Sequence, residues 1–139
     1  MDNHKIIGSF ELVGFPDYQM EGIVAKIDTG AFTGSLHCTK IEEGYSDGHK
    51  TLTFSPFDHP EIIIATTEYA SRKVKSSNGK SQMRYFIKTT ITIQKQPYQI
   101  ELSLADRSEM KWPVLVGRRF LHKNDFLVDI NHANDIVTK

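Results

Sequence analysis

The 139-residue chain has a single cysteine, Cys38, no net charge and no long apolar run. One cysteine cannot form a disulfide within the chain, which agrees with a reducing compartment. No apolar run approaches the ~20 residues of a membrane-spanning helix. The polar start of the sequence is followed only by Ile6-Ile7, which is too short for the apolar part of a secretory signal. We therefore expect a cytoplasmic protein that does not enter the membrane.

The chain also lacks the common signatures of metal and nucleotide sites. There is no His-Glu-x-x-His, no Cys-x-x-Cys and no glycine-rich loop ending in Lys-Ser or Lys-Thr. His37 and Cys38 are adjacent, so on a strand they point to opposite faces and are poorly placed to share one ion. The other candidate zinc ligands are scattered along the chain: His49, His59, His122 and His132. We expect neither zinc nor ATP as a cofactor, and any dependence on ATP would come from a partner protein.

Charge is unevenly distributed although lysine plus arginine equals aspartate plus glutamate, 17 each. Residues 1–68 hold eleven acids and four bases, and residues 101–139 hold six of each. Residues 69–100 hold seven bases and no acid: Arg72, Lys73, Lys75, Lys80, Arg84, Lys88 and Lys95. Such a local excess of positive charge favours an acidic partner. Tyr69, Tyr85 and Phe86 lie in the same stretch, as in single-stranded nucleic-acid binders, but the neutral total disfavours nucleic acid.

Short apolar segments with alternating or β-branched residues recur along the sequence, and turn residues separate them. This spacing is typical of an all-β barrel or sandwich. Strands are predicted over residues 6–13, 23–27, 51–54, 61–66, 85–93, 98–104, 114–116 and 126–130, and one short helix near 117–123. Turns are predicted at 46–48, at Asn78-Gly79 and at Gln96-Pro97. No linker or repeat divides the chain, so a single domain over residues 1–139 is expected.

One triplet stands out chemically, Asp28-Thr29-Gly30, directly after the apolar strand 23–27. A lone carboxylate is a poor hydrolytic catalyst. Two carboxylates held about 3 Å apart share a proton near working pH, because both cannot ionise easily. One then acts as base toward a water while the other donates to the scissile carbonyl. Since the triplet occurs once, the second Asp28 would come from another copy of the chain across a two-fold axis. By itself the triplet is also a common turn sequence.

Two longer segments give the triplet its context: residues 25–37, Ala-Lys-Ile-Asp-Thr-Gly-Ala-Phe-Thr-Gly-Ser-Leu-His, and residues 104–121, which include Pro-Val-Leu-Val-Gly-Arg. In their order and spacing they resemble the retropepsin-like aspartic peptidases. They are closer still to a bacterial and archaeal subgroup, the RimK-associated family named as ATP-dependent zinc proteases. The resemblance spans roughly residues 6–130. It implies an all-β fold, a single retropepsin-like closed barrel with a β-hairpin flap and one short C-terminal helix, acting as a homodimer.

The resemblance also implies roles for individual residues. Asp28, Thr29 and Gly30 correspond to the catalytic triplet, with Thr29 tying the two active-site loops together across the dimer axis. Ala31 stands where pepsin-like enzymes often have serine, so fewer hydrogen bonds stabilise the ionised pair and activity nearer neutral pH is expected. The residues expected to contact substrate are Ala31, Lys75, Asn78, Gly79, Lys80, Arg84 and Val116. Those expected to support the site are Arg118, Asp106 and Arg107.

The sequence departs from the viral retropepsins at three places. Phe32 and Thr33 stand where those enzymes have two acids, so Arg118 needs another partner, with Asp106 or Glu109 as candidates, or is simply solvated. Viral dimers are held by interleaved chain termini, and the sequence does not show that sheet. The segment 73–84 is basic, whereas viral flaps are glycine-rich and apolar. It is either a charged lid or a solvated hairpin whose lysines discourage edge pairing.

Two functions fit this sequence. The first is a homodimeric aspartic endopeptidase that cleaves peptides, with acidic or glutamate-rich peptides favoured by the basic hairpin. The family's association with ligases that add glutamates to a ribosomal protein agrees with that substrate. The second is a non-catalytic barrel that binds acidic tails through the basic hairpin. An obligate dimer is needed only by the first.

Overall fold

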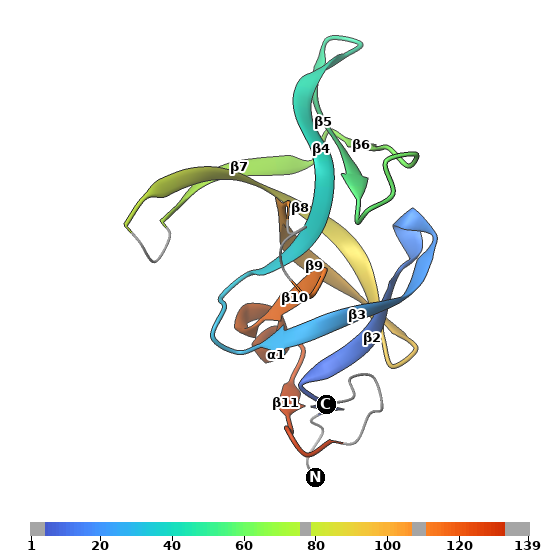
Figure 1. Cartoon of the computed structure of the whole chain (residues 1–139), viewed down its shortest axis with the longest axis vertical. Coiled ribbons are helices and arrows are strands. Elements are labelled where there is room, and N and C mark those ends of the chain that lie inside the picture. Colours follow the sequence, from blue (N-terminus) through green and yellow to red (C-terminus); the bar gives the residue numbers. More distant parts are fainter. Residues whose placement is uncertain (1–4, 76–78, 107–110, 133–139) are drawn as a thin grey trace.

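The computed structural model describes residues 5–75, 79–106 and 111–132. Strands dominate these ranges, with one short α-helix and one turn of 3-10 helix (Figure 1). In chain order the elements are β1 Lys5–Ile7, β2 Phe10–Phe15, the 3-10 turn Pro16–Tyr18, β3 Met20–Asp28, β4 Gly34–Ser46, β5 His49–Pro56, β6 Ile64–Thr66, β7 Tyr69–Lys75, β8 Ser81–Ile93, β9 Gln96–Ala105, β10 Val114–Gly117, α1 Arg118–Lys123 and β11 Phe126–Val128. No helix within the described ranges is long and apolar enough to cross a membrane.

Nine of these strands form one sheet in the order β10-β3-β2-β8-β9-β4-β5-β6, with β7 paired to β8. The sheet curves so far that β10, at one end of this order, also pairs with β4. β10 therefore lies between β3, to which it is parallel, and β4, to which it is antiparallel. The two remaining strands, β1 and β11, form a separate parallel pair. In Figure 1 β11 lies at the opposite end of the molecule from the β4–β5 hairpin.

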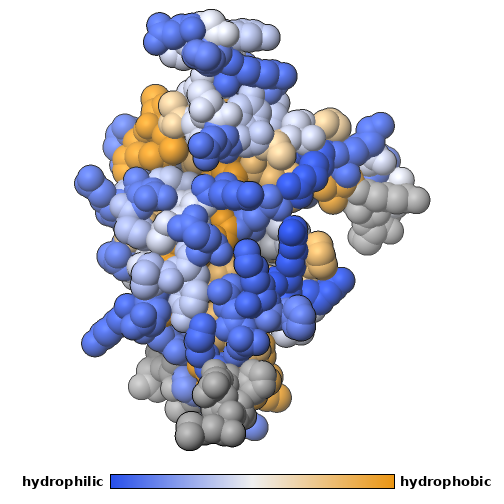
Figure 2. Space-filling view, turned by 180° about the vertical axis from the view of Figure 1, so that it is seen from behind, coloured by the Kyte–Doolittle hydropathy of each residue, from blue (hydrophilic) through white to orange (hydrophobic). Residues whose placement is uncertain are grey.

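The core fills the inside of this curved sheet with branched aliphatic and aromatic side chains. Alternate residues of β8 and β9 point inward, as the two-residue period of a strand requires, and Ile91, Ile93 and Leu102 are fully buried. The side chains of Phe15, Tyr18 and Phe57 form an aromatic group beside them. Hydrophilic side chains cover most of the face shown in Figure 2. The alternation seen in the sequence is thus the alternation between core and solvent.

Most of the predicted strands and the short helix are confirmed. The segment after Asp28 differs, because it contains a strand that the sequence did not predict. The sequence predicted no strand over residues 34–46, yet β4 runs through all thirteen of them. Its outer half is exposed, from Glu42 to Ser46, and carries few apolar residues. An exposed strand buries little, so it leaves no hydrophobic pattern to detect. β4 is nevertheless central to the site, because it starts beside the loop that follows Asp28.

One predicted turn needs correction, and another lies partly outside the described residues. The turn expected at Gln96-Pro97 lies two residues earlier, at Gln94 and Lys95, which have φ of 51° and 68°. Both residues adopt the left-handed conformation of a two-residue hairpin turn, and Pro97 pairs with Thr92 inside the sheet. The turn predicted at Asn78-Gly79 falls partly outside the described residues, because Asn78 is not among them. The strands on either side are paired as far as Lys75 and Ser81.

Candidate functional site

Asp28 is the last residue of β3, a strand held from both sides. β10 runs parallel to it, and Gly117 is the register partner of Asp28. Near the end of β3 the backbone N–H of Ile27 donates to Ser9 O at 2.9 Å. The Asp28 side chain is half-buried, whereas Thr29 and Gly30 are exposed. A strand that is paired on both sides therefore places the Asp28 carboxylate near the surface at a fixed position.

The loop after β3 is held by its own backbone groups. Asp28 Oδ1 accepts a hydrogen bond from Gly30 N at 3.0 Å, and Asp28 O accepts one from Ala31 N at 3.2 Å. From the other side, Arg118 N donates to Ala31 O at 2.8 Å and Arg119 N donates to Phe32 O at 3.1 Å. The first turn of α1 thus binds the loop through backbone donors that have no partner within the helix.

Gly117 permits this close approach. A Cβ at that position would lie 2.7 Å from Phe32 O, 2.9 Å from Ala31 O and 2.9 Å from Gly34 N. Such distances are shorter than real Cβ contacts, and the atoms concerned belong to the backbone. Gly34 is placed in the same way, because its Cβ would meet the carbonyl oxygen of Leu115. The Gly-Arg segment and the loop after Asp28 therefore form one tightly packed unit.

Arg118 finds a partner that the sequence did not predict. Its Nη1 donates to Gly30 O at 3.1 Å, and its guanidinium lies 5.3 Å from the ring centre of Phe32. Phe32 is 55% exposed and also lies 5.7 Å from the Arg119 guanidinium. Of the two acids suggested as partners, Glu109 lies outside the described residues. Asp106 is exposed and is within 3.9 Å of His37 Nδ1. The Arg118 side chain thus contacts the loop after Asp28 through a backbone carbonyl and an aromatic face.

The hairpin predicted as a flap is present as β7 and β8, paired from Tyr69 and Ile87 to Lys75 and Ser81. It projects from the sheet on the same side as the loop after β3 (Figure 1). Gly79 has φ of 85° and is exposed, as is Lys80. Arg84 is half-buried, and its Nε has no hydrogen-bond partner among the described residues. Asn78 lies outside them, and at Lys75 the structure describes only the backbone.

The remaining predicted site residues separate from one another. Val116, expected to touch substrate, is fully buried in β10 and belongs to the core of this chain. Ala31 is half-buried in the loop after Asp28. Asp106 lies at the end of β9, near His37, and Arg107 is outside the described residues. The structure thus brings together Asp28 to Ala31 and Arg118, and leaves Asp106 elsewhere.

A cavity of about 550 Å³ opens beside Phe32 and Thr33. Its walls come from the loop after β3, from β7, β8 and β9, and from α1. We call it the basic pocket. It is lined by Phe32, Thr33, Gly34, Arg72, Lys88, Gln99, Ile100, Glu101, Arg119, Phe120 and Lys123. Its volume is within the usual range for ligand sites.

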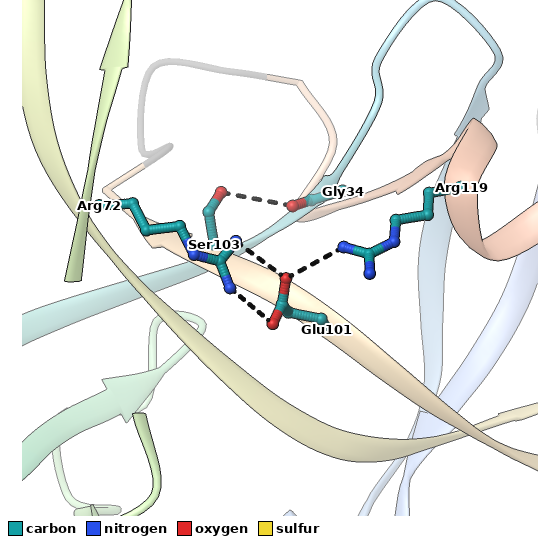
Figure 3. Close-up of polar contacts among 5 residues, drawn as sticks. All are labelled: Gly34, Arg72, Glu101, Ser103 and Arg119. Carbon is teal, nitrogen blue, oxygen red and sulfur yellow. Dashed lines mark hydrogen bonds and ion pairs between the residues drawn. The ribbon is translucent and has the colours of Figure 1, made fainter. Parts of the chain in front are cut away.

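Glu101 is the acidic residue of that lining. Its oxygens accept two hydrogen bonds from the Arg72 guanidinium, at 2.9 and 3.1 Å, and Arg119 Nη1 is 3.7 Å away (Figure 3). The hydrogen bonds from Arg72, and then the nearby positive charges, hold the pKa of Glu101 below its ordinary value. Next to it, Ser103 Oγ donates to Gly34 O at 3.3 Å. Glu101 therefore links β7 to α1, the helix that follows Gly117.

The histidines and the cysteine do not form a metal centre in the described ranges, where no group of three or more His, Cys, Asp or Glu side chains could hold an ion. His37 is buried, with Nε2 at 2.8 Å from Asp58 Oδ1. Cys38 points into the core, and its burial raises the pKa of the thiol to about 12. These residues do not fit a zinc site, so no step is derived through zinc. The expectation that neither zinc nor ATP serves as cofactor stays a prediction.

Comparison with known families matches residues 6–137 to one described as RimB-like, Retropepsin-like aspartic endopeptidase RimB. The chain belongs to this RimB-like family. The match covers both the Asp28 loop and the Gly117-Arg118 segment whose contacts are described above. The resemblance read from residues 25–37 and 104–121 is therefore confirmed.

Relatives of the RimB-like chain include longer proteins. A probable alpha-L-glutamate ligase of Shewanella pealeana is 35% identical over 133 residues, which cover 92% of this chain and 29% of that protein. One of Desulfotalea psychrophila is 34% identical, covering 82% and 26%. The chain thus spans less than a third of the length of the curated relatives that it matches. A solved structure of a Legionella pneumophila protein of unknown function (DUF785) is similar with a TM-score of 0.75 and 26% identity, covering 97% of this chain and 99% of that one.

Sequence reasoning missed the basic pocket of this RimB-like protein. Arg72 and Lys88 were counted as bases of one stretch, but nothing indicated that α1 would bring Arg119 and Lys123 to the same place. One signal was available. Glu101 is the first acid after 32 residues without one, and in a β8–β9 hairpin with its turn at 94–95 it faces Lys88. The correct turn position would therefore have shown the acid lying among the bases.

Proposed function

We propose that this chain is an aspartic endopeptidase that acts as a homodimer, with Asp28 from each copy activating one water molecule. The observation that carries the proposal is the anchoring of the Asp28 loop. Five hydrogen bonds, two of them from Arg118 and one each from Gly30, Ala31 and Arg119, fix the loop while the carboxylate stays half-buried. A catalytic group must be held in such a preorganised position.

In the proposed reaction, one Asp28 of the pair is protonated and the other is ionised. The ionised carboxylate accepts a proton from water as its oxygen attacks the scissile carbonyl carbon, and the protonated carboxyl donates to the carbonyl oxygen. The resulting tetrahedral diol then breaks its C–N bond while the leaving nitrogen takes the proton that the first carboxylate accepted from water, and a hydroxyl of the diol returns a proton to the second carboxylate, which restores the pair. The two apparent pKa values belong to the pair and not to either residue.

We propose that the second copy binds at the β1–β11 pair. β1 and β11 form a two-stranded sheet on which Ile6 and Leu127, which are register partners, are 39% and 43% exposed. Terminal strands are also the elements that hold viral retropepsin dimers. We further propose that the curved sheet, in which β10 pairs with both β3 and β4, acts as a closed barrel. We place the reaction in the cytoplasm because the single buried thiol fits a reducing compartment.

For the substrate we propose a peptide with acidic residues. The β7–β8 hairpin, which carries Lys73, Lys80 and Arg84, projects on the side of the Asp28 loop (Figure 1), and the basic pocket lies next to that loop. Clefts lined by one sign of charge concentrate ligands of the opposite sign. The relatives named as glutamate ligases agree with a substrate rich in glutamate.

A second function is favoured by one observation. Asp28 Oδ1 accepts the Gly30 N–H, a contact that also serves an ordinary turn without any catalysis. The chain would then be a monomeric barrel that binds acidic tails. Replacing Asp28 by asparagine keeps an acceptor oxygen for Gly30, so binding would survive in this second function.

Analytical ultracentrifugation across a wide concentration range, at mildly acidic and at neutral pH, tests the proposal. We expect a dimer whose association is changed in Asp28→Asn, because removing the shared proton alters the contact between the two carboxyl groups. A matched Asp47→Asn variant, changed in the exposed β4–β5 turn, should associate as the unmodified protein does.

A monomer at every concentration would overturn the homodimeric peptidase and favour the binding barrel. If the dimer forms, cleavage of a glutamate-rich peptide is measured next. Asp28→Asn should abolish it, and retained cleavage by that variant would exclude the shared-carboxylate mechanism.

A further inference from the structure

The basic pocket holds more positive than negative charge. Arg72, Lys88, Arg119 and Lys123 line it, against the single carboxylate of Glu101. Glu101 compensates one of these four cations, which leaves three positive charges in the lining. Lys88 and Lys123 take part in none of the ion pairs found among the described residues. The lining therefore has an excess of positive charge, which favours the binding of an anionic ligand from outside the chain.

The cations come from three separate elements and converge on one place. Arg72 is on β7, Lys88 on β8 beside its register partner Glu101 on β9, and Arg119 and Lys123 are on α1. Glu101 is the anchor of this arrangement. Its bidentate contact fixes the planar Arg72 guanidinium (Figure 3). The same guanidinium lies 4.3 Å from the ring centre of Phe86. A guanidinium fixed on two sides loses little further entropy when it meets a ligand.

Arg119 retains donors for a ligand. Its Nη1 is 3.7 Å from Glu101, which is longer than a hydrogen bond, and its side chain is 61% exposed. The five N–H donors of an arginine form a fork that matches the two oxygens of a carboxylate. Gln99 adds an uncharged amide at the same wall, and the phenyl ring of Phe120 adds an apolar surface against which a short aliphatic stem can pack.

We propose that the basic pocket is a subsite for the carboxylate side chain of a bound peptide, with Arg119, Lys88 and Lys123 as the groups that select it. The assignment rests on the proposed function. In this assignment, acidic residues of the peptide are recognised where β7, β9 and α1 meet, and not at the tip of the β7–β8 hairpin as the sequence suggested. The pocket begins at Phe32 and Thr33, four and five residues after Asp28. A peptide lying across the Asp28 loop reaches it with a neighbouring side chain.

Glu101 has a distinct task in this subsite. It is a resident carboxylate that shows where an oxyanion is stable in the pocket, and both Arg72 and Arg119 are directed at it. Because it is already bound by Arg72, a peptide carboxylate meets mainly Arg119 and the two lysines. Selectivity for charge then depends on the α1 residues more than on β7.

Peptide binding to the Asp28→Asn protein tests the subsite without cleavage. The probe is a fluorescein-labelled peptide of alternating glutamate and alanine, and its control has glutamine in place of glutamate. Binding is followed by fluorescence anisotropy. In Arg119→Gln/Lys123→Gln we expect the glutamate peptide to bind roughly ten-fold more weakly, since two charge-assisted contacts are lost. The glutamine peptide should bind with unchanged affinity.

A matched variant removes a charge outside the pocket. Lys95 lies in the β8–β9 turn, is exposed and does not line the pocket, so Lys95→Gln should leave both affinities unchanged. If the double variant binds both peptides more weakly by the same factor, the subsite is overturned. The subsite is also overturned if Lys95→Gln weakens binding of the glutamate peptide as much as the double variant does. No binding of the glutamate peptide to the unmodified pocket at any concentration would also overturn it.

The subsite and the peptidase can fail separately. If the glutamate peptide binds selectively but the unmodified protein, with Asp28 intact, does not cleave it, the proposed subsite is supported and the proposed peptidase activity is rejected. Cleavage of glutamate and glutamine peptides at the same rate would retain the enzyme and reject the subsite. Inhibition of binding by free acetate as effective as by the unlabelled peptide would show a site for small anions only, and would overturn the proposal that it reads a peptide side chain.

Discussion

The carboxylate of Glu101, on β9, interacts with Arg72 on β7 and with Arg119 on α1. Its side chain is 19% exposed and receives both hydrogen bonds of Arg72, whereas the Arg72 side chain is 46% exposed. Contacts of this kind stabilise a protein by more than an isolated surface pair does, because the geometry is bidentate and one partner is largely shielded. They also make the stability of the molecule depend on the protonation of one residue.

We expect Glu101→Gln to lower the free energy of unfolding by about 1 kcal/mol at neutral pH. The pKa of Glu101 is lowered in the folded chain, chiefly by the hydrogen bonds from Arg72. A lowered pKa means that this stabilisation is present above the unfolded pKa, near 4.3, and disappears as pH falls through the folded pKa. Urea unfolding of both proteins from neutral to strongly acidic pH measures the difference.

The matched control is Glu42→Gln, on the exposed outer half of β4, and its unfolding free energy should differ little from that of the unmodified protein at any pH. A gap between Glu101→Gln and the unmodified protein that persists unchanged into strong acid would show that the lost contact is not ionic.

Single residues also show how far the sequence could be read. Asp28 and Arg118 were recognised from their motifs, and the structure places them in one unit. The contact of Arg118 with Gly30 O could not be predicted, because a backbone carbonyl has no signature in the sequence. Phe32 was noted as a departure from the viral pattern, but its position against two arginines depends on how α1 follows β10.

At the scale of elements, the junction of β10, α1 and the loop after β3 depends on Gly117. Its neighbours within 3 Å of an added Cβ are all backbone atoms, which cannot move aside as a flexible side chain can. We expect Gly117→Ala to lower the free energy of unfolding by about 2 kcal/mol, the usual cost of overpacking, and to displace the Asp28 loop. Urea unfolding measures the first effect, and the amide chemical shifts of Gly30 and Ala31 measure the second.

Gly44 offers the comparison, since a Cβ there meets nothing within 4 Å. Gly44→Ala on β4 should leave stability unchanged or slightly higher, because alanine restricts the unfolded chain. Equal stability of the two variants would mean that the loop and Gly117 separate freely, and would contradict the tight junction.

Strands with a clear alternation of core and solvent residues were predicted from the sequence, and β4 and β7 were not. The predicted strand 98–104 covers most of β9, and the predicted strand 85–93 covers β8 except its first four residues. The inner half of β4, Gly34–Cys38, is buried at every residue, shows no such alternation and was missed. The outer half of β4 and much of β7 lie at the surface. Their strand conformation therefore depends on pairing with β5 and β8 and not on a hydrophobic pattern of their own. The basic pocket was hidden for the same reason, because it is assembled from β7, β9 and α1 only after the sheet has curved.

At the scale of the whole molecule, the curved sheet and the β1–β11 pair have different surroundings. The sheet encloses its own core, but the β1–β11 pair has one buried face, with Ile7 fully covered, and one face where Ile6 and Leu127 stay exposed. An apolar pair on a two-stranded sheet is the kind of surface that a second copy covers. Because neighbouring side chains on a strand alternate between faces, the exposed pair contributes little to the core of one chain.

We therefore expect Leu127→Lys to weaken the proposed homodimer roughly ten-fold or more, because a two-fold interface would carry the unpaired ammonium from both copies. Sedimentation of the variant at several concentrations measures this. Leu12→Lys is the matched control: Leu12 is 50% exposed on β2, so the same substitution there should leave association unchanged. The free energy of unfolding of each monomer should fall little in either variant. If Leu127→Lys sediments as the unmodified protein does, the terminal strands do not hold the two copies together, and any pairing of two Asp28 side chains must use another face.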